Sequence, residues 1–194
     1  MKRSLMTVAF ASLSLLPLTA EQYVSVQAGT DYCHHTDEND RGQKIGYKVG
    51  AAYGYKFANG IRGELELAYR DGHKRTSYVY VDGGDDSKTH VSSHSMSYMA
   101  NFAYDIGGLQ TYGITPYVGA GIGVCSNTYE LKTQKGGVTT NRDHGKDDRF
   151  AYQLIAGAKY PIAEKLELAG EYKYFVGAYH AKNHSFSAAL IRSF

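Results

Sequence analysis

The sequence predicts an all-β protein, an eight-stranded antiparallel up-and-down β-barrel that spans a membrane. Three observations predict it: the composition, a strict alternation of apolar and polar residues, and connections that alternate between short and long. The chain has 194 residues, with 22 Gly and 18 Tyr but only 3 Pro and no Trp. Tyr favours strands, whereas this much Gly is unfavourable within helices. The length suits a single domain.

The alternation is clearest between Lys44 and Asn59. Successive side chains of a strand point to opposite faces, so a half-buried strand alternates with a period of two. One predicted face carries Ile45, Tyr47, Val49, Ala51, Tyr53, Tyr55 and Phe57. The other face carries Gly46, Lys48, Gly50, Ala52, Gly54 and Lys56.

Seven further segments show the same alternation over about ten residues each, a length that suits tilted membrane strands. We predict strands at Gln22–Tyr32, Ile61–Arg70, His94–Ile106, Pro116–Cys125, Phe150–Tyr160, Leu166–Val176 and Ser185–Phe194.

The connections differ between the two ends of the predicted barrel. Long polar connections are expected at Cys33–Gln43, Asp71–Ser93 and Ser126–Arg149, with a shorter one at Gly177–Asn183. The other end has tight turns at Asn59-Gly60 and Pro161–Lys165 and an intermediate link at Gly107–Gly113. Bacterial membrane barrels place short turns on the periplasmic side, so the long connections are expected outside the cell.

The N-terminus predicts export. Lys2 and Arg3 precede an apolar stretch from Leu5 to Leu18, and Thr19-Ala20 offers cleavage before Glu21. We therefore expect a signal peptide at 1–20 and the barrel at 21–194, with a retained anchor as the alternative. Removal of Lys2 and Arg3 from the 21 basic residues would balance the 19 acidic ones. A neutral chain argues against nucleic acid as a partner.

A soluble eight-stranded barrel alternates in the same way and is the competing fold. The two folds differ in which face is inside. Glycines crowd the polar face here, where they would weaken a solvated exterior without benefit but would make room in a narrow lumen. They are Gly46, Gly50, Gly54, Gly119, Gly121, Gly123 and Gly157. We therefore expect the polar face inside and the apolar face against lipid.

The inward face carries equal numbers of acids and bases. The acids are Asp31, Glu64, Glu66, Asp105, Glu167 and Glu171, and the bases are Lys48, Lys56, Arg62, Arg70, Lys159 and Lys173. An eight-stranded barrel is only wide enough for its side chains to fill it. Unpaired charges there would each cost several kcal/mol. We expect a salt-bridged filling, with a narrow selective pore as the alternative.

The eight histidines all fall in outer connections or at outer strand ends: His34, His35, His73, His90, His94, His144, His180 and His184. One interpretation is that polar loops simply tolerate histidine. The other is a rim that binds a transition metal, through His34 and His35, or gains charge as the pH falls to about 6. Apart from this metal hypothesis, we expect no cofactor.

The two cysteines, Cys33 and Cys125, both have inward parity at the outer ends of their strands. Disulfides form and persist in the periplasm, which predicts a bond between them. Their strands stand opposite each other, however, and a disulfide needs Cα atoms about 4.4–6.8 Å apart. The bond therefore requires the chain after Tyr32 to fold in over the mouth of the barrel.

Several segments resemble the small outer-membrane β-barrel family that includes opacity-type proteins and related bacterial surface antigens of the porin family. They read YKVGAAYGYKFANGIRGELELAYR, TPYVGAGIGV, FAYQLIAGAKYPIAEKLELAGEYKYF and SFSAALIRSF, and span most of the chain. The resemblance implies insertion by the outer-membrane assembly machinery, which reads a terminal aromatic residue such as Phe194. Arg192 departs from the family pattern by placing a charge on the lipid side, close enough to the end to reach the headgroups.

The resemblance also implies contact with outer-membrane lipids and lipopolysaccharide and, through the outer loops, adhesion to a host-cell or matrix ligand. The loops themselves match nothing, so the ligand is left open. Outer-membrane lipid A deacylases resemble this chain in size and carry His and Ser two residues apart on a late strand. Here Phe186 stands two residues after His184, and the His-x-Ser pair at His90 and Ser92 lies earlier. We predict a non-enzymatic surface protein without catalytic residues, with a narrow channel and a lipid-modifying enzyme as alternatives.

Overall fold

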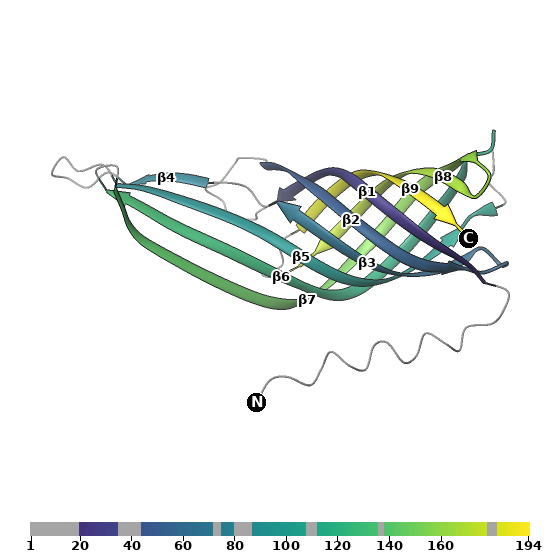
Figure 1. The fold of residues 1–194 in the computed structure, drawn as a ribbon, viewed down its shortest axis with the longest axis horizontal. Helices are drawn as coiled ribbons and strands as arrows, with labels where there is room; N and C mark the ends of the chain where they lie inside the picture. The colour runs from purple at the N-terminus through teal and green to yellow at the C-terminus, as the bar shows by residue number, and fades with distance from the viewer. Residues whose placement is uncertain are drawn as a thin grey trace, which may run out of the picture.

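The computed structural model describes residues 20–34, 44–71, 75–79, 87–107, 112–135, 138–177 and 182–194. These residues form nine strands (Figure 1). The strands are β1 (Glu21–His34), β2 (Lys44–Lys56), β3 (Ile61–Asp71), β4 (Arg75–Val79), β5 (Ser87–Asp105), β6 (Thr115–Lys135), β7 (Val138–Ala163), β8 (Leu166–Val176) and β9 (Lys182–Ser193).

All the strand pairs are antiparallel, and the sheet closes on itself. The strand order is β3-β2-β1-β9-β8-β7-β6-β5-β4, and an additional pairing joins β3 to β5. This pairing runs from Ile61 opposite Tyr104 to Asp71 opposite His94. Eight of the described strands therefore form the barrel wall, and β4 lies beyond it. The predicted eight-stranded barrel is confirmed.

The predicted orientation of the two faces is also confirmed. The apolar side chains point outward: Phe102 is 62% exposed, Ile122 60% and Leu154 55%. The charged side chains point inward, and Lys48 is fully buried. No helix in the described part of the chain is long and apolar enough to cross a membrane.

Two predicted outer loops are largely strand, which corrects the sequence prediction. β5 begins at Ser87, inside the expected Asp71–Ser93 connection, and β6 and β7 extend through most of the expected Ser126–Arg149 connection. The antiparallel ladder continues from Ser126 opposite Asp148 to Lys135 opposite Val138. Beyond a membrane both faces of a strand meet water, so hydrophobic alternation disappears while backbone pairing continues. We call this outer extension of β5, β6 and β7, together with β4, the outer ribbon.

The short connections lie at the opposite end of the barrel, as predicted. At the β2–β3 turn the backbone amide of Gly60 donates to the carbonyl of Phe57 over 3.0 Å. Gly60 has φ +83°, which a residue without Cβ adopts readily. The start of β1 and the end of β9 also lie at this end, because Tyr23 pairs with Ser193.

Apolar residues also enter the lumen, which the alternation did not reveal. A cluster near the short-turn end contains Tyr23, Tyr117, Ile155, Ala169, Ala189 and Ile191, and a second cluster contains Met99, Cys125, Ala151 and Phe175. Tyr23 and Tyr117 cross the lumen over two glycines. A methyl group added at Gly54 would lie 2.7 Å from Cζ of Tyr23, and one at Gly157 would lie 2.5 Å from Cζ of Tyr117.

We therefore expect Gly157→Ala to destabilise the barrel by about 1–3 kcal/mol, because overfilling a packed interior costs this much. The methyl group must displace the Tyr117 ring or the backbone carbonyl of Gly170, which would lie 2.8 Å from it. Guanidinium titration in lipid vesicles, followed by circular dichroism, measures the loss. Gly170→Ala is the matched control, because its added methyl meets nothing within 4 Å. Equal stability of the two variants would contradict this account of the lumen.

Candidate functional site

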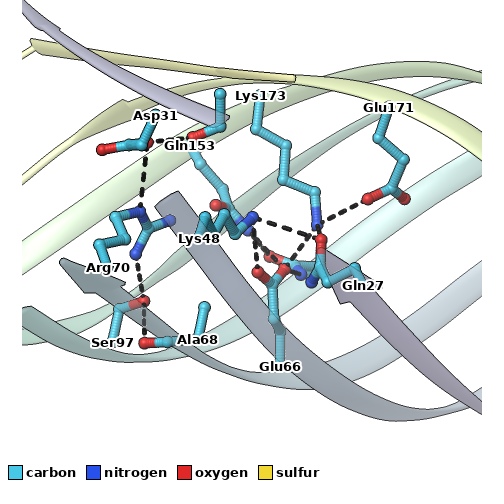
Figure 2. A network of polar contacts seen from close by, with 12 residues as sticks. Gln27, Asp31, Lys48, Glu66, Ala68, Arg70, Ser97, Gln153, Glu171 and Lys173 are labelled. Atoms are coloured by element: carbon cyan, nitrogen blue, oxygen red, sulfur yellow. Dashed lines mark hydrogen bonds and ion pairs between the residues drawn. The ribbon is translucent and has the colours of Figure 1, made fainter. Parts of the chain in front are cut away.

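The middle of the lumen is organised around the carboxylate of Glu66 on β3. Its Oε1 lies 3.2 Å from Nζ of Lys48, and its Oε2 lies 2.9 Å from Nζ of Lys173. Both ammonium groups also reach Oε1 of Gln27, at 3.3 Å and 3.1 Å. Figure 2 shows these side chains converging from different strands. One buried carboxylate therefore joins two buried lysines across the barrel.

Neutral amides complete this centre. Asn101 and Gln153 donate to Oε2 of Glu66 over 2.8 Å and 3.0 Å, and Gln153 also donates to Oδ1 of Asn101 over 2.8 Å. Asn101 donates to Glu64 as well, over 2.9 Å. Buried charges are tolerated when hydrogen bonds satisfy their remaining lone pairs and protons. The amides supply those bonds here.

Toward the outer end, Asp31 on β1 and Arg70 on β3 form a second group. Nε of Arg70 lies 3.8 Å from Oδ1 of Asp31, which also accepts a hydrogen bond from Ser185. Nη1 of Arg70 donates to Ser97 over 2.6 Å, and its guanidinium carbon lies 3.9 Å from the centre of the Phe175 ring. Figure 2 shows this group beside the Glu66 centre. Stacking and ionic contacts together hold the guanidinium across the lumen.

Toward the short-turn end, Asp105 on β5 binds two cations. Its Oδ1 lies 3.0 Å from Nε of Arg62, and its Oδ2 lies 2.6 Å from Nζ of Lys159. Lys159 also reaches Glu167 over 3.3 Å, and Glu167 lies 4.0 Å from Lys56. The guanidinium of Arg62 sits over the Tyr117 ring, 4.4 Å from its centre.

Below this group the lumen widens into a cavity of about 660 Å³ at the short-turn mouth. Charged residues of both signs line it, namely Glu21, Lys56, Asp105, Lys159 and Glu167. The Arg62 and Lys159 contacts and the two tyrosines lie between this cavity and the Glu66 centre.

The structure thus brings all twelve predicted lumen charges into contact with partners. Tyr23 donates to Glu64 over 2.8 Å, and Tyr117 donates to Glu171 over 2.7 Å, so these two acids are engaged as well. Glu171 also lies 3.1 Å from Lys173. The filling consists of groups of ion pairs and hydrogen bonds that follow one another along the lumen.

The sequence analysis missed the uncharged members of this set. Gln27, Asn101 and Gln153 share the inward parity of the charged residues, so their positions contained the necessary signal. Tyr23 and Tyr117 did not stand out, because tyrosines also fill the outward face. Their signal is parity alone: each lies one residue out of phase with its strand's outward side chains.

Cys125 carries a free, buried thiol in the structure. The predicted disulfide to Cys33 is therefore not formed there. The backbone of Cys33 is paired with Lys44 on β2 and with Asn183 on β9, which keeps it in the barrel wall. β1 and β6 are separated by β9, β8 and β7, so the two cysteines stand on opposite sides of the lumen. The inward fold of the chain that the bond requires is absent at Cys33.

The predicted metal ligands lie outside what the structure describes: residue 35 and the side chain of His34 are not part of it. Within the described residues, no group of three or more His, Cys, Asp and Glu side chains is arranged to hold a metal ion. The metal rim stays a prediction.

At the C-terminal end of β9, Phe194 is 60% exposed and its amide donates to the carbonyl of Gln22 over 2.9 Å. Arg192 is exposed on the outward face.

A closed barrel with an apolar exterior and a charged, internally paired lumen is a transmembrane β-barrel of the outer-membrane type. A family model for the outer membrane protein beta-barrel domain matches residues 5–194. The chain belongs to this family, and the protein is an outer-membrane protein.

Two curated relatives match most of this chain, and one of them carries the same description. An outer membrane protein of Gluconacetobacter diazotrophicus is 34% identical over 139 residues, covering 66% of this chain and 35% of that protein. An uncharacterized protein of Brucella abortus is 31% identical over 174 residues, covering 79% of this chain and 58% of the relative. The chain therefore spans between about a third and three fifths of these relatives' length.

Solved structures share the fold. Neisserial surface protein A (NspA) matches with a TM-score of 0.59 at 16% identity, covering 89% of this chain and 97% of that one. Ail, the attachment invasion locus protein of Yersinia pestis, matches with a TM-score of 0.57 at 12% identity in its complex with the heparin analogue sucrose octasulfate. That match covers 91% of this chain and all of Ail. At these identities the likeness concerns the fold.

Proposed function

We propose that the protein is a non-enzymatic surface protein whose barrel anchors the outer ribbon for contact with a ligand outside the cell. The observation that carries the proposal is the ribbon itself. β6 and β7 stay paired for about ten residues beyond Ser126 and Asp148, which corresponds to roughly 30 Å of extended chain. Figure 1 shows the ribbon extending well past the other strands.

The ribbon offers free backbone edges. β7 pairs with β8 only from Tyr152 onward, so in the described residues its outer half has β6 on one side alone. β4 pairs with β5 on one side in the same way. Free strand edges can bind an extended segment of another chain. A ribbon held by three barrel strands presents these edges in a fixed geometry.

The lumen supports an anchor more than a channel. A conducting barrel needs an open, water-filled path, whereas ion pairs fill this lumen. The Glu66–Lys173 pair joins β3 to β8 across the barrel, and the Arg70–Asp31 and Arg62–Asp105 pairs lie on either side of it along the lumen. The complex of Ail with a heparin analogue shows a barrel of this fold binding a polyanion. The described outer part of β7 carries both signs of charge, with Lys146 lying 3.9 Å from Asp148. We therefore propose a host-cell or matrix ligand whose binding does not depend on polyanion recognition alone.

Shortening the ribbon should abolish binding to the ligand while leaving the barrel folded. The strand register allows residues 128–146 and 72–93 to be removed while the barrel wall stays paired, because Asn127 pairs with Asp147 and Asp71 pairs with His94. Each pair can be rejoined through an Asn-Gly turn, which suits two-residue hairpins. Whole cells that display the parent or the shortened protein are then compared for adherence to cultured host cells and to immobilised matrix proteins.

The matched control removes β4 alone and keeps the outer extensions of β5, β6 and β7 intact. Circular dichroism and surface labelling establish equal folding and display. We expect adherence of the parent to exceed that of the shortened protein at least severalfold. Equal adherence of the two, at equal display, would refute the proposed role of the ribbon.

A further inference from the structure

The outward face of β8, β9 and β1 carries an aromatic and basic cluster close to the outer end. His184 on β9 lies directly opposite Tyr174 on β8 and Tyr32 on β1. The Tyr174 and His184 rings have centroids 5.2 Å apart, and the Tyr172 and His184 rings 6.0 Å apart. Ser185 and Lys173, their neighbours along the chain, are fully buried, so the cluster faces away from the lumen.

A hydrogen bond orients the imidazole. The Tyr172 hydroxyl lies 2.7 Å from Nδ1 of His184. When the phenol donates this bond, the neutral ring carries its proton on Nε2; when the imidazole is charged, both nitrogens carry protons. In each of these states Nε2 is a hydrogen-bond donor.

Lys182 adds a positive charge on the same face, two residues before His184. The residues opposite it are Val176 on β8 and His34 on β1. Those opposite His184 are the two tyrosines, so no carboxylate occupies a facing position in either ladder. An ammonium group and an imidazole donor without a facing acid suit an anion, and phosphate in particular.

The outward residues of β9 change character with depth. Lys182 and His184 come first, Phe186 follows with 54% of its surface exposed, and Leu190 lies further down. The Phe186 ring packs against Tyr172 with centroids 5.1 Å apart. Cation, aromatic ring and aliphatic side chain in this order match the headgroup, interface and acyl region of a lipid leaflet.

We propose that this patch, formed by Tyr32, Tyr172, Tyr174, Lys182 and His184, binds the phosphate of a phosphorylated glycolipid in the outer leaflet. The lysine and the Nε2 donor contact the phosphate, and the aromatic rings pack beside the sugar and the upper acyl chains. The site depends on the outer-membrane placement of the barrel and not on the outer ribbon. Loss of the ribbon's ligand would therefore leave it intact.

A second cluster on the opposite wall provides a matched comparison. His94 on β5 packs against Tyr69 on β3 with ring centroids 5.9 Å apart, and Tyr69 packs against Tyr47. Here Asp71 stands directly opposite His94. A carboxylate in that place repels phosphate, so this cluster should not bind it although its aromatic and histidine content is similar.

The test uses the refolded full-length barrel in zwitterionic phosphatidylcholine nanodiscs. Lipid A carrying its phosphates, or lipid A from which they have been removed, is added, and the bound lipid is quantified by native mass spectrometry. We expect the combined Lys182→Gln and His184→Gln variant to weaken binding of phosphorylated lipid A about tenfold, because charge-assisted hydrogen bonds are lost. Lys182→Arg should keep the affinity, and His94→Gln should leave it unchanged.

Two further arms distinguish the source of the phosphate and protect the test against misfolding. Inorganic phosphate should fail to displace the bound lipid; displacement would show a site for free phosphate and overturn the glycolipid assignment. Lys182→Gln alone changes only the exposed first residue of β9 and should still lower the affinity if the double variant does not fold. Equal binding of dephosphorylated lipid A, or an equal loss in His94→Gln, would overturn the proposal.

Discussion

Glu66→Gln should destabilise the barrel by about 3–5 kcal/mol, the usual cost of removing one partner from a buried ionic group. Glu66 is the only carboxylate that Lys48 contacts in the described lumen, at 3.2 Å, and both side chains are fully buried. The glutamine leaves that ammonium without a counter-charge and weakens the hold on Lys173, 2.9 Å away. Guanidinium titration of the refolded protein in vesicles gives the loss.

Two variants separate charge from packing in this prediction. Lys56→Gln removes a partly exposed lysine 4.0 Å from its acid, and such pairs contribute at most about 1 kcal/mol. Adding Lys48→Gln to Glu66→Gln removes the stranded charge and should restore part of the lost stability. A double variant no more stable than Glu66→Gln would contradict the ionic explanation.

Planar-bilayer recordings of the parent should show no stable ion-selective current, and a steady current would favour the channel alternative.

The barrel wall could be predicted from the sequence because lipid acts on one face only. β8 was predicted at Leu166–Val176, and the structure has the same bounds. Each outward residue there must be compatible with lipid and each inward one with a narrow polar interior, so a period of two is enforced at every step. β3 and β5 correspond to the third and fourth of the eight predicted strands, so their pairing follows from the up-and-down order of the barrel.

The sequence does not predict the outer ribbon, because its residues show no alternation of apolar and polar side chains. From Ser126 to Lys135 polar residues occupy both parities of the strand, so no period of two remains in the sequence. What holds these residues in a strand is pairing with β5 and β7, a non-local interaction that a single segment does not reveal. A polar segment without alternation fits an exposed strand as well as a loop, so its composition alone does not distinguish the two.

The lumen contacts were predictable in kind but not in detail. Parity placed Glu66, Lys48 and Lys173 inside, yet their meeting depends on the tilt and stagger of the closed barrel. Those quantities follow from the register of all eight ladders together. The same geometry places Cys33 and Cys125 on opposite walls, which parity alone does not show.

Leu154→Arg should cost about 2–4 kcal/mol, the depth-dependent penalty for arginine on the lipid face near the middle of the bilayer. Leu154 lies between the outward tyrosines Tyr152 and Tyr160 and is 55% exposed, so its side chain contacts acyl chains. Ile122→Arg on the neighbouring strand should behave in the same way. Ile162→Arg is the control: Ile162 is 48% exposed but lies beside the short turn, where arginine reaches the headgroups and costs about 0–1 kcal/mol. Titrations in vesicles should therefore rank the variants by depth. If Leu154→Arg and Ile122→Arg were as stable in vesicles as the parent, the apolar face would not be in contact with lipid, and the membrane placement of this wall would be wrong.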